Sequence, residues 1–267
     1  MARPEHGRVD LEALDASDTR GIKRRQAEKS MLADEEHLMQ LQDELHAEAK
    51  RSILIVLQGP DTSGKDGTIR YALRGFNPQG VRIVQFKAPT EAERRHSFLW
   101  RIKRKLPAPG EIVIFNRSHY EDVLIARVRS LASPRVINER YGQINRFEQG
   151  LVTGGTAIVK VCLNISQDEQ KRRLLARLDD PDKHWKFSEA DLAERPLWDA
   201  YQKAYSTALG RCSTPVAPWY VIPANRKWYR NWAVTQILIE TLEEMKPAYP
   251  RPNLDVGALK KDLQEED

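Results

Sequence analysis

The stretch Ile53-Leu-Ile-Val-Leu-Gln-Gly-Pro-Asp-Thr-Ser-Gly-Lys-Asp-Gly67 decides the fold of this chain. It opens with a run of apolar residues, 53–57, which is typical of a strand buried on both faces of a parallel sheet. The next residues place two glycines and a lysine in the G-x-x-x-x-G-K spacing of a phosphate-binding loop. The sequence therefore predicts a strand, a phosphate loop and a helix, in that order.

The loop residues have the chemistry that phosphate binding requires. Gly59 and Gly64 let backbone N–H groups approach a phosphate without a Cβ in the way. The following helix directs the positive end of its dipole at the same anion, and Lys65 adds a cation. The alternative is a glycine-rich turn with an exposed lysine, but the strand, glycines and lysine together favour phosphate binding.

One loop position departs from the usual motif. Asp66 stands where a Ser or Thr would bind magnesium, and a second acid, Asp61, lies inside the loop. An acid in the first turn of a helix is favourable in any case, so Asp66 can be explained as a helix cap. We therefore favour Asp61 as the residue that holds magnesium or steers the phosphate acceptor.

Composition limits the classes of protein to consider. The 267 residues are 40% hydrophobic and 30% charged, as in a soluble globular protein. No apolar run is long enough to span a bilayer and the N-terminus lacks the apolar core of a signal peptide, so we expect a cytoplasmic protein. Two cysteines make neither a disulfide framework nor a metal site. The net charge of +5 favours an anionic partner, whether nucleic acid, nucleotide or inorganic polyanion.

Alternation of strands and helices predicts a single α/β domain over residues 21–250, with a five-stranded parallel sheet and helices on both faces. We expect a flexible N-terminus over 1–20 and a C-terminal tail over 251–267. The expected strands are 53–57, 81–86, 111–115, 156–163 and 219–222. The expected helices are 22–50, 65–74, 91–105, 133–150, 167–178, 188–209 and 228–245.

Polar residues follow the third strand at its carboxyl end, beside the phosphate loop. Arg117 has the geometry to clamp a phosphate with two parallel hydrogen bonds, and Glu121 and Asp122 can bind metal directly or through water. A purely structural Arg–Asp–Glu network is the weaker alternative at this position. The stretch 87–90 leaves the second strand at the same edge, where open parallel sheets bind ligands.

A basic segment over about 171–190 follows the fourth strand. Its placement resembles the lid of small nucleotide kinases, which closes over phosphates, excludes water and supplies arginines to the transition state. A solvated basic helix is the alternative. The cations of the segment are Lys171, Arg172, Arg173, Arg177, Lys183 and Lys186.

Four stretches, taken in order, carry a family pattern. They are Gly59-Pro-Asp-Thr-Ser-Gly-Lys-Asp-Gly-Thr68, Phe86-Lys-Ala-Pro-Thr90, Phe115-Asn-Arg-Ser-His-Tyr-Glu-Asp-Val-Leu124 and Ala176-Arg-Leu-Asp-Asp-Pro-Asp-Lys-His-Trp-Lys-Phe187. Together they resemble the family-2 polyphosphate kinases over about residues 20–250. The resemblance implies a thymidylate-kinase-like P-loop fold, a three-layer α/β/α domain with an N-terminal helical extension and a helical lid. It also implies magnesium-dependent (or manganese-dependent), reversible phosphoryl transfer between inorganic polyphosphate and AMP, ADP or ATP.

The resemblance also assigns roles to residues. Many members have Asp where Asn116 stands and Asn where Glu121 stands, and the pattern here resembles the class that accepts both AMP and ADP. We expect metal ligation by Asp61 and Asp122. The expected catalytic residues are Asp61, Lys65, Arg117, Glu121 and Arg177. The expected phosphate and polyphosphate contacts are Gly59, Gly64, Lys65, Asp66, Gly67, Arg70, Arg117, Arg172, Arg173 and Lys186. The expected nucleotide contacts are Lys87, Pro89, Thr90, Asn116 and Arg117.

Two other functions remain open at this point. An ATP-dependent nucleotide kinase on the same fold would need an adenine pocket for its donor and fewer cations leading away from the loop. A non-enzymatic nucleic-acid-binding protein is suggested only by the pI near 9.1, and it would not need Asp61 or the pair Glu121 and Asp122. We expect no nucleic-acid or membrane partner, and the resemblance implies a homo-oligomer.

Overall fold

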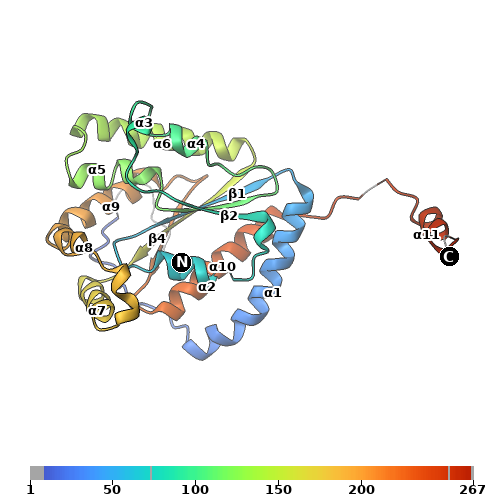
Figure 1. The fold of residues 1–267 in the computed structure, drawn as a ribbon, viewed down its shortest axis with the longest axis horizontal. Coiled ribbons are helices and arrows are strands. Elements are labelled where there is room, and N and C mark those ends of the chain that lie inside the picture. The colour runs from blue at the N-terminus through green and yellow to red at the C-terminus, as the bar shows by residue number, and fades with distance from the viewer. Residues whose placement is uncertain (1–8, 73, 252, 266–267) are drawn as a thin grey trace.

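A parallel sheet forms the centre of the molecule in the computed structural model, which describes residues 9–72, 74–251 and 253–265. Figure 1 shows the sheet, whose strand order is β2-β3-β1-β4-β5. All neighbouring strands run parallel, which confirms the predicted five-stranded sheet. The strands are β1 (Ser52–Gln58), β2 (Val81–Gln85), β3 (Ile112–Asn116), β4 (Thr156–Asn164) and β5 (Trp219–Pro223).

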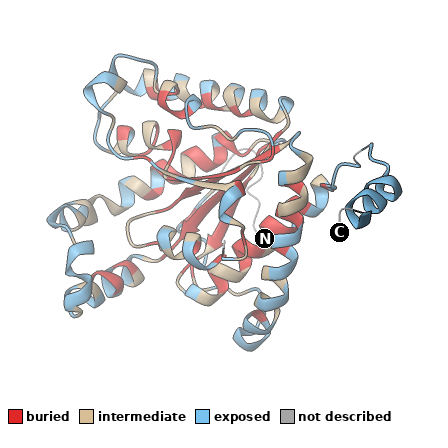
Figure 2. Cartoon of the chain, turned by 45° about the vertical axis from the view of Figure 1, so that its right-hand side comes forward, coloured by how far each residue is buried: buried red, intermediate tan, exposed pale blue. Residues whose placement is uncertain are grey.

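Helices cover both faces of this sheet, which confirms the three-layer α/β/α architecture. Side chains of β1 alternate between two cores: Ile53, Ile55 and Leu57 enter one, and Leu54 and Val56 enter the other. Figure 2 shows the buried strands enclosed between the helical layers. Helices α1 (Arg24–Glu48), α2 (Lys65–Ala72) and α10 (Lys227–Met245) pack on the first core. Helices α4 (Trp100–Lys103), α6 (Pro134–Thr153) and α9 (Trp198–Cys212) pack on the second.

The register of the central strands brings the two predicted motifs together. β1 lies between β3 and β4, and Leu57 of β1 is level with Asn116 of β3. The N–H of Arg117 donates to the carbonyl of Leu57 at 3.1 Å. The phosphate loop after β1 and the polar segment after β3 therefore leave the sheet side by side, at the edge where parallel sheets bind ligands.

The predicted lid consists of three short elements at this edge. They are α7 (Gln167–Leu178), the 3-10 turn η3 (Pro181–Lys186) and α8 (Glu189–Glu194). Ser166 begins α7 by accepting a hydrogen bond from the N–H of Glu169, and Ser188 begins α8 with a capping box. The remaining short elements are η1 (Pro78–Gly80), α3 (Glu91–Arg94), η2 (His119–Asp122), α5 (Ile125–Val128), η4 (Arg195–Leu197) and α11 (Val256–Glu265).

Two predicted helices are interrupted. The expected helix 91–105 is two short helices, α3 and α4, because its first half has no buried residue while Leu99 and Ile102 of the second half pack on the sheet. The expected helix 188–209 divides into α8, η4 and α9. Pro196 lies at the division, where a residue without an N–H cannot continue the helical hydrogen bonds.

The two ends of the chain differ in how they meet the domain. Residues 9–20 were expected to be flexible with the rest of the N-terminus, but Leu11 and Ala16 are buried and the carbonyl of Ala16 accepts a hydrogen bond from Asn225; residues 1–8 of that segment lie outside the described residues. In the tail, α11 has no buried residue and stands apart from the body (Figure 1).

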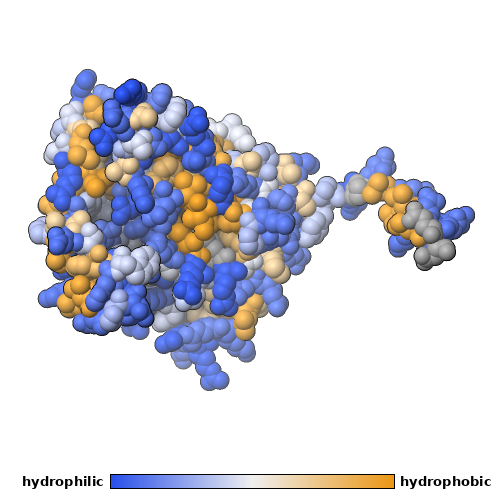
Figure 3. Space-filling view, viewed as in Figure 1, coloured by the Kyte–Doolittle hydropathy of each residue, from blue (hydrophilic) through white to orange (hydrophobic). Residues whose placement is uncertain are grey.

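The surface agrees with the composition. Most of the face in Figure 3 is hydrophilic, as expected for a chain with 30% charged residues. Within residues 9–72, 74–251 and 253–265, no helix has both the length and the apolar composition that crossing a bilayer requires.

Candidate active site

The loop between β1 and α2 has a backbone that only glycine can follow at two positions. Gly59 and Gly64 have φ of +150° and +100°. A Cβ on Gly59 would lie 2.7 Å from the carbonyl oxygen of Leu163, and one on Gly64 would lie 1.8 Å from Nη1 of Arg230. The positive φ favours glycine at both positions of the predicted motif, and at Gly59 the Leu163 carbonyl also leaves no room for a side chain.

Lys65, at the start of α2, closes back over this loop. Its Nζ donates to the carbonyl of Gly59 at 2.8 Å and to that of Pro60 at 3.3 Å. Burial lowers the pKa of Lys65, and the negative charge of Asp61 opposes that shift. The ammonium is thus held over the loop by two carbonyls, at the place where a phosphate would replace them as partner.

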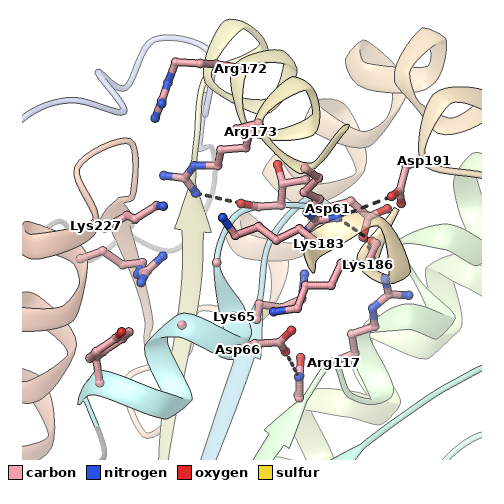
Figure 4. Close-up of a pocket in the computed structure, with 18 of the residues that line it drawn as sticks. Asp61, Lys65, Asp66, Arg117, Arg172, Arg173, Lys183, Lys186, Asp191 and Lys227 are labelled. Carbon is pink, nitrogen blue, oxygen red and sulfur yellow. Dashed lines mark hydrogen bonds and ion pairs between the residues drawn. The ribbon is translucent and has the colours of Figure 1, made fainter. Parts of the chain in front are cut away.

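A cavity of about 400 Å³ extends from the loop between the lid and the first turns of α10. Figure 4 shows its cationic side chains converging from several elements, with Lys227 on the side of α10 and Arg117 on the opposite side. Nine cations line it against three carboxylates, Asp61, Asp66 and Asp191. The cations are Lys65, Arg117, Arg172, Arg173, Arg177, Lys183, Lys186, Lys227 and Arg230.

A second cavity, of about 300 Å³, lies on the other side of the loop. Trp198, Tyr201 and Tyr205 of α9 provide an aromatic wall, and Asp61, Arg117 and Glu121 are among its polar residues. Asp61, Arg117 and Asp191 line both cavities, so the two spaces meet at these residues.

The junction of the cavities is an ion-paired cluster. Nη2 of Arg117 donates to Oδ1 of Asp61 at 2.9 Å, and its Nη1 lies 3.8 Å from Oε2 of Glu121. Burial raises the pKa of Glu121, while the positive charges of Arg117 and Lys65 oppose the shift. The structure thus brings together four of the five expected catalytic residues, Asp61, Lys65, Arg117 and Glu121.

The predicted lid residues reach the first cavity in different ways. Arg177 donates to the carbonyl of Lys186 at 3.1 Å and lies 3.6 Å from Asp191, so it ties α7 to η3 and α8. Arg177, Lys186 and Arg172 all line the cavity. The side chain of Arg172 is 65% exposed and paired with the neighbouring Glu169, so it can turn toward an anion.

Arg173, an expected phosphate contact, lies beneath the phosphate loop. Its guanidinium is buried and donates to the carbonyls of Thr62 and Ser63 in the loop. The same group donates to the carbonyls of Ala224 and Asn225 after β5, and its Nε donates to Glu169. Arg173 lines the cavity, and its hydrogen bonds to four backbone carbonyls and to Glu169 help to fix the shape of the phosphate loop.

Some expected site residues lie elsewhere. Arg70 is on the exposed face of α2, where it stacks over Tyr71. The carbonyls of Lys87 and Pro89 accept hydrogen bonds from Arg101 and Arg94, and Thr90 caps α3; none of the three lines either cavity. Of the expected nucleotide residues, Asn116 does reach the first cavity, where its amide donates to Asp66 at 2.9 Å. Gly67 also lines that cavity, and Gly59 lines the second.

The two expected metal ligands are also separated. Oδ1 of Asp122 lies 3.6 Å from Arg140, and Asp122 lines neither cavity, because η2 turns its side chain toward α6. Asp61 faces both cavities. In the described part of the chain, no three His, Cys, Asp or Glu side chains are grouped to hold a metal by themselves. Magnesium commonly takes one or two carboxylates together with substrate phosphates and water, and Asp61 at a phosphate cavity fits that mode.

Several lining residues were not predicted as site residues. Lys227 and Arg230 come from the first turn of α10, and Tyr201 and Tyr205 come from α9. Arg230 is buried, and its pKa is lowered to about 10 by burial and by the neighbouring charge of Arg173. A signal was present: basic residues at the helix start that follows the fifth strand lie at the ligand-binding edge of a parallel sheet.

Comparison with known proteins gives consistent results. A family model described as Polyphosphate kinase 2 matches residues 21–250. The AMP/ADP-polyphosphate phosphotransferase of Meiothermus ruber is 49% identical over 92% of this chain and 93% of its own. The ADP-polyphosphate phosphotransferase of Rhodopseudomonas palustris is 45% identical over 80% of this chain and 78% of its own. The crystal structure of Polyphosphate Kinase 2 from Arthrobacter aurescens TC1 superposes with a TM-score of 0.95 at 45% identity, covering 99% of this chain and 95% of the other.

Proposed function

The chain belongs to the polyphosphate kinase 2 family, and from this premise we propose that it transfers phosphoryl groups between inorganic polyphosphate and AMP or ADP, in both directions. The observation that carries the proposal is the meeting of two unlike cavities at Asp61 and Arg117. One is lined by cations beside a phosphate loop, and the other has an aromatic wall.

The cationic cavity is the proposed site of polyphosphate. Polyphosphate carries about one negative charge per unit, so a long chain needs cations well beyond the reacting phosphate, as nucleic-acid backbones do. Lys227 extends the positive lining to α10, on the side away from Arg117 (Figure 4), and Arg230 of the same helix also lines the cavity. An ATP-dependent nucleotide kinase would instead need a base pocket along this path.

The aromatic cavity is the proposed site of the nucleotide. Flat aromatic side chains can stack on a base, and Trp198, Tyr201 and Tyr205 provide such surfaces. The relative from M. ruber is named for AMP and ADP, and the one from R. palustris for ADP. We accordingly place the acceptor phosphate of AMP or ADP at Arg117, where this cavity opens onto the other.

The proposed chemistry needs little covalent participation by the protein. Phosphoryl transfer depends on holding donor and acceptor in line and on neutralising the charge that spreads over the transferred group. Lys65 and Arg117 line the cationic cavity and would supply positive charge to that group, and Arg177 of α7 would add a further positive charge. Asp61 would hold a magnesium or manganese ion, and the ion would neutralise further negative charge on the phosphates of donor and acceptor. We also propose that Asp61 orients the acceptor through its hydrogen bond with Arg117.

Glu121 is the proposed determinant of AMP use. AMP has one phosphate and ADP has two, so the terminal oxygen of AMP must reach the reaction point from deeper in the aromatic cavity. A carboxylate can recruit a cation or an ordered water that bridges this gap, and a neutral amide binds a cation more weakly. Glu121→Asn should therefore lower kcat/KM for AMP about tenfold more than kcat/KM for ADP.

The measurement compares both acceptors at fixed magnesium and saturating polyphosphate. Glu194→Gln is the matched control, because Glu194 lines the same cavity but pairs with Arg129 away from the junction. It should change both acceptors alike. Equal losses with AMP and ADP in Glu121→Asn would mean that Glu121 serves the shared chemistry or the fold instead.

The basic test of the proposal is incubation with AMP, magnesium and polyphosphate in the absence of ATP, followed by separation of nucleotides. We expect ADP and then ATP to form; no nucleotide product would contradict the proposal. We further propose a cytoplasmic location and a homo-oligomer. Size-exclusion chromatography with light scattering would test the homo-oligomer by giving the molar mass of the protein in solution.

A further inference from the structure

Four buried polar side chains connect the segment 116–122, which ends at the junction of the cavities, to the core of the protein. They are His119 and Tyr120 of that segment, Glu148 of α6 and Lys160 of β4, and each is 0% exposed. None of them lines either cavity. Taking an ion pair out of water costs several kcal/mol of hydration free energy for each ion. The fully buried pair of Glu148 and Lys160 therefore needs an explanation other than stability.

The four groups form one network with Glu148 at its centre. Nζ of Lys160 lies 2.5 Å from Oε2 of Glu148 and donates to the Tyr120 hydroxyl at 2.9 Å and to the carbonyl of Cys212 at 2.7 Å. The Tyr120 hydroxyl donates to Oε1 of Glu148 at 2.8 Å, and Nε2 of His119 lies 3.2 Å from the same oxygen. Two successive residues of the segment are thus fastened to α6, β4 and the end of α9.

The electrostatics of Glu148 support an ionised carboxylate at this centre. Burial alone would raise the pKa of Glu148, but the charge of Lys160 and the hydrogen bond with His119 outweigh it and lower the pKa. A charged carboxylate accepts stronger hydrogen bonds than a neutral one. The hydrogen bonds to Glu148 therefore restrict the movement of Tyr120 and His119.

These hydrogen bonds are needed because the backbone of the segment is strained at Arg117. Arg117 has φ of 62°, in the left-handed region that side chains disfavour. Such strain costs about 1–3 kcal/mol and persists only where the surroundings fix the conformation. The strained conformation is the one in which Arg117 contacts Asp61 and Glu121.

We propose that Glu148 and Lys160 are positioning residues, which hold Arg117 and Glu121 at the junction of the cavities through Tyr120 and His119. The proposal rests on the function given above, because it takes Arg117 and Glu121 to contact the substrates. The alternative is that the network serves only the stability of the fold. Experiment can separate the positioning role from a purely structural role. If the network serves only stability, variants should lose activity only in proportion to the protein that fails to fold.

The first test is Tyr120→Phe, which removes one tether and leaves the ion pair intact. The remaining ring can still pack on Trp219, whose ring centroid is 4.7 Å away, so the variant should fold with a Tm within a few degrees of the parent. We expect kcat per folded enzyme to fall about tenfold, because small displacements of catalytic groups are costly. KM for polyphosphate should stay unchanged, since the phosphate loop is held by Arg173 and not by Tyr120.

Tyr229→Phe is the matched control. Tyr229 is a buried tyrosine of the opposite core with no part in the network, so its variant should keep the parental kcat. Parental kcat in folded Tyr120→Phe would overturn the proposal. So would a rise in the KM for polyphosphate equal to the loss of kcat, which indicates a general loosening of the site.

The second test is the double variant Glu148→Leu/Lys160→Met, which removes both buried charges together. Replacing a buried ion pair by apolar residues of similar volume is often neutral for stability or stabilising. We expect a folded protein whose kcat falls at least as far as in Tyr120→Phe. A folded double variant with parental kcat would overturn the proposal, and if the double variant does not fold, Tyr120→Phe decides alone.

Failure of this inference is distinguishable from failure of the proposed function. The parental protein is assayed beside the variants with AMP, magnesium and polyphosphate. An inactive parent refutes the proposed function, whereas an active parent with equally active, folded variants refutes the positioning role of the network only.

Discussion

Asp61→Asn should lower kcat/KM by about 10²-fold or more while leaving the fold intact. The change is nearly isosteric, but it removes the negative charge that faces both cavities and pairs with Arg117 at 2.9 Å. That charge is proposed to hold the metal ion and orient the acceptor, and both contacts matter most in the transition state. Steady-state kinetics with AMP and polyphosphate, together with circular dichroism, measures the effect.

Asp168→Asn controls for the loss of one negative charge near the site. Asp168 lies in the first turn of α7, is exposed and lines neither cavity. It should retain parental turnover. If folded Asp61→Asn also turns over at the parental rate, Asp61 has no role in the chemistry.

Lys65→Ala should produce a comparable loss, but one that appears in both kcat and the KM for polyphosphate. In the structure the ammonium is held over the loop by the carbonyls of Gly59 and Pro60, ready to exchange them for phosphate oxygens. Its removal takes away a cation that contacts phosphate in the ground state and in the transition state. We expect kcat/KM for polyphosphate to fall about 10²-fold or more.

Lys171→Ala is the matched control for this variant. Lys171 is an exposed lysine of α7 and lines neither cavity, so its loss should leave KM for polyphosphate within about twofold of the parent. An unchanged KM for polyphosphate in Lys65→Ala would show that the loop does not bind the donor.

The parts of the fold that local sequence determines were predicted correctly. The apolar run 53–57 makes β1, and both glycines of the loop have a positive φ that other residues rarely adopt. The break between α8 and α9 had a local signal in Pro196 that was missed. The break after α3 had none, because it depends on which residues the sheet buries.

The site was predictable where its residues follow the carboxyl ends of neighbouring strands. Asp61, Lys65 and Arg117 come together because β1 and β3 are adjacent in the sheet, and the polar residues after the third strand were expected beside the phosphate loop. Lys227 had a signal in its place at the helix start after the fifth strand. Tyr205 lies within α9, and only tertiary packing shows that it reaches the second cavity. Sequence could not separate the neighbours Arg172 and Arg173 either, although one is exposed and the other is buried beneath the loop.

The identity of the phosphate donor is the central claim, and one comparison tests it most directly. With AMP as the common acceptor and magnesium fixed, initial rates of ADP formation give kcat/KM for polyphosphate and for ATP. Among the described residues, Tyr71 is the one aromatic side chain that lines the cationic cavity between the lid and α10. This lining predicts that polyphosphate is the better donor by at least about tenfold. A higher kcat/KM for ATP than for polyphosphate would contradict the account and identify the protein as an ATP-dependent nucleotide kinase.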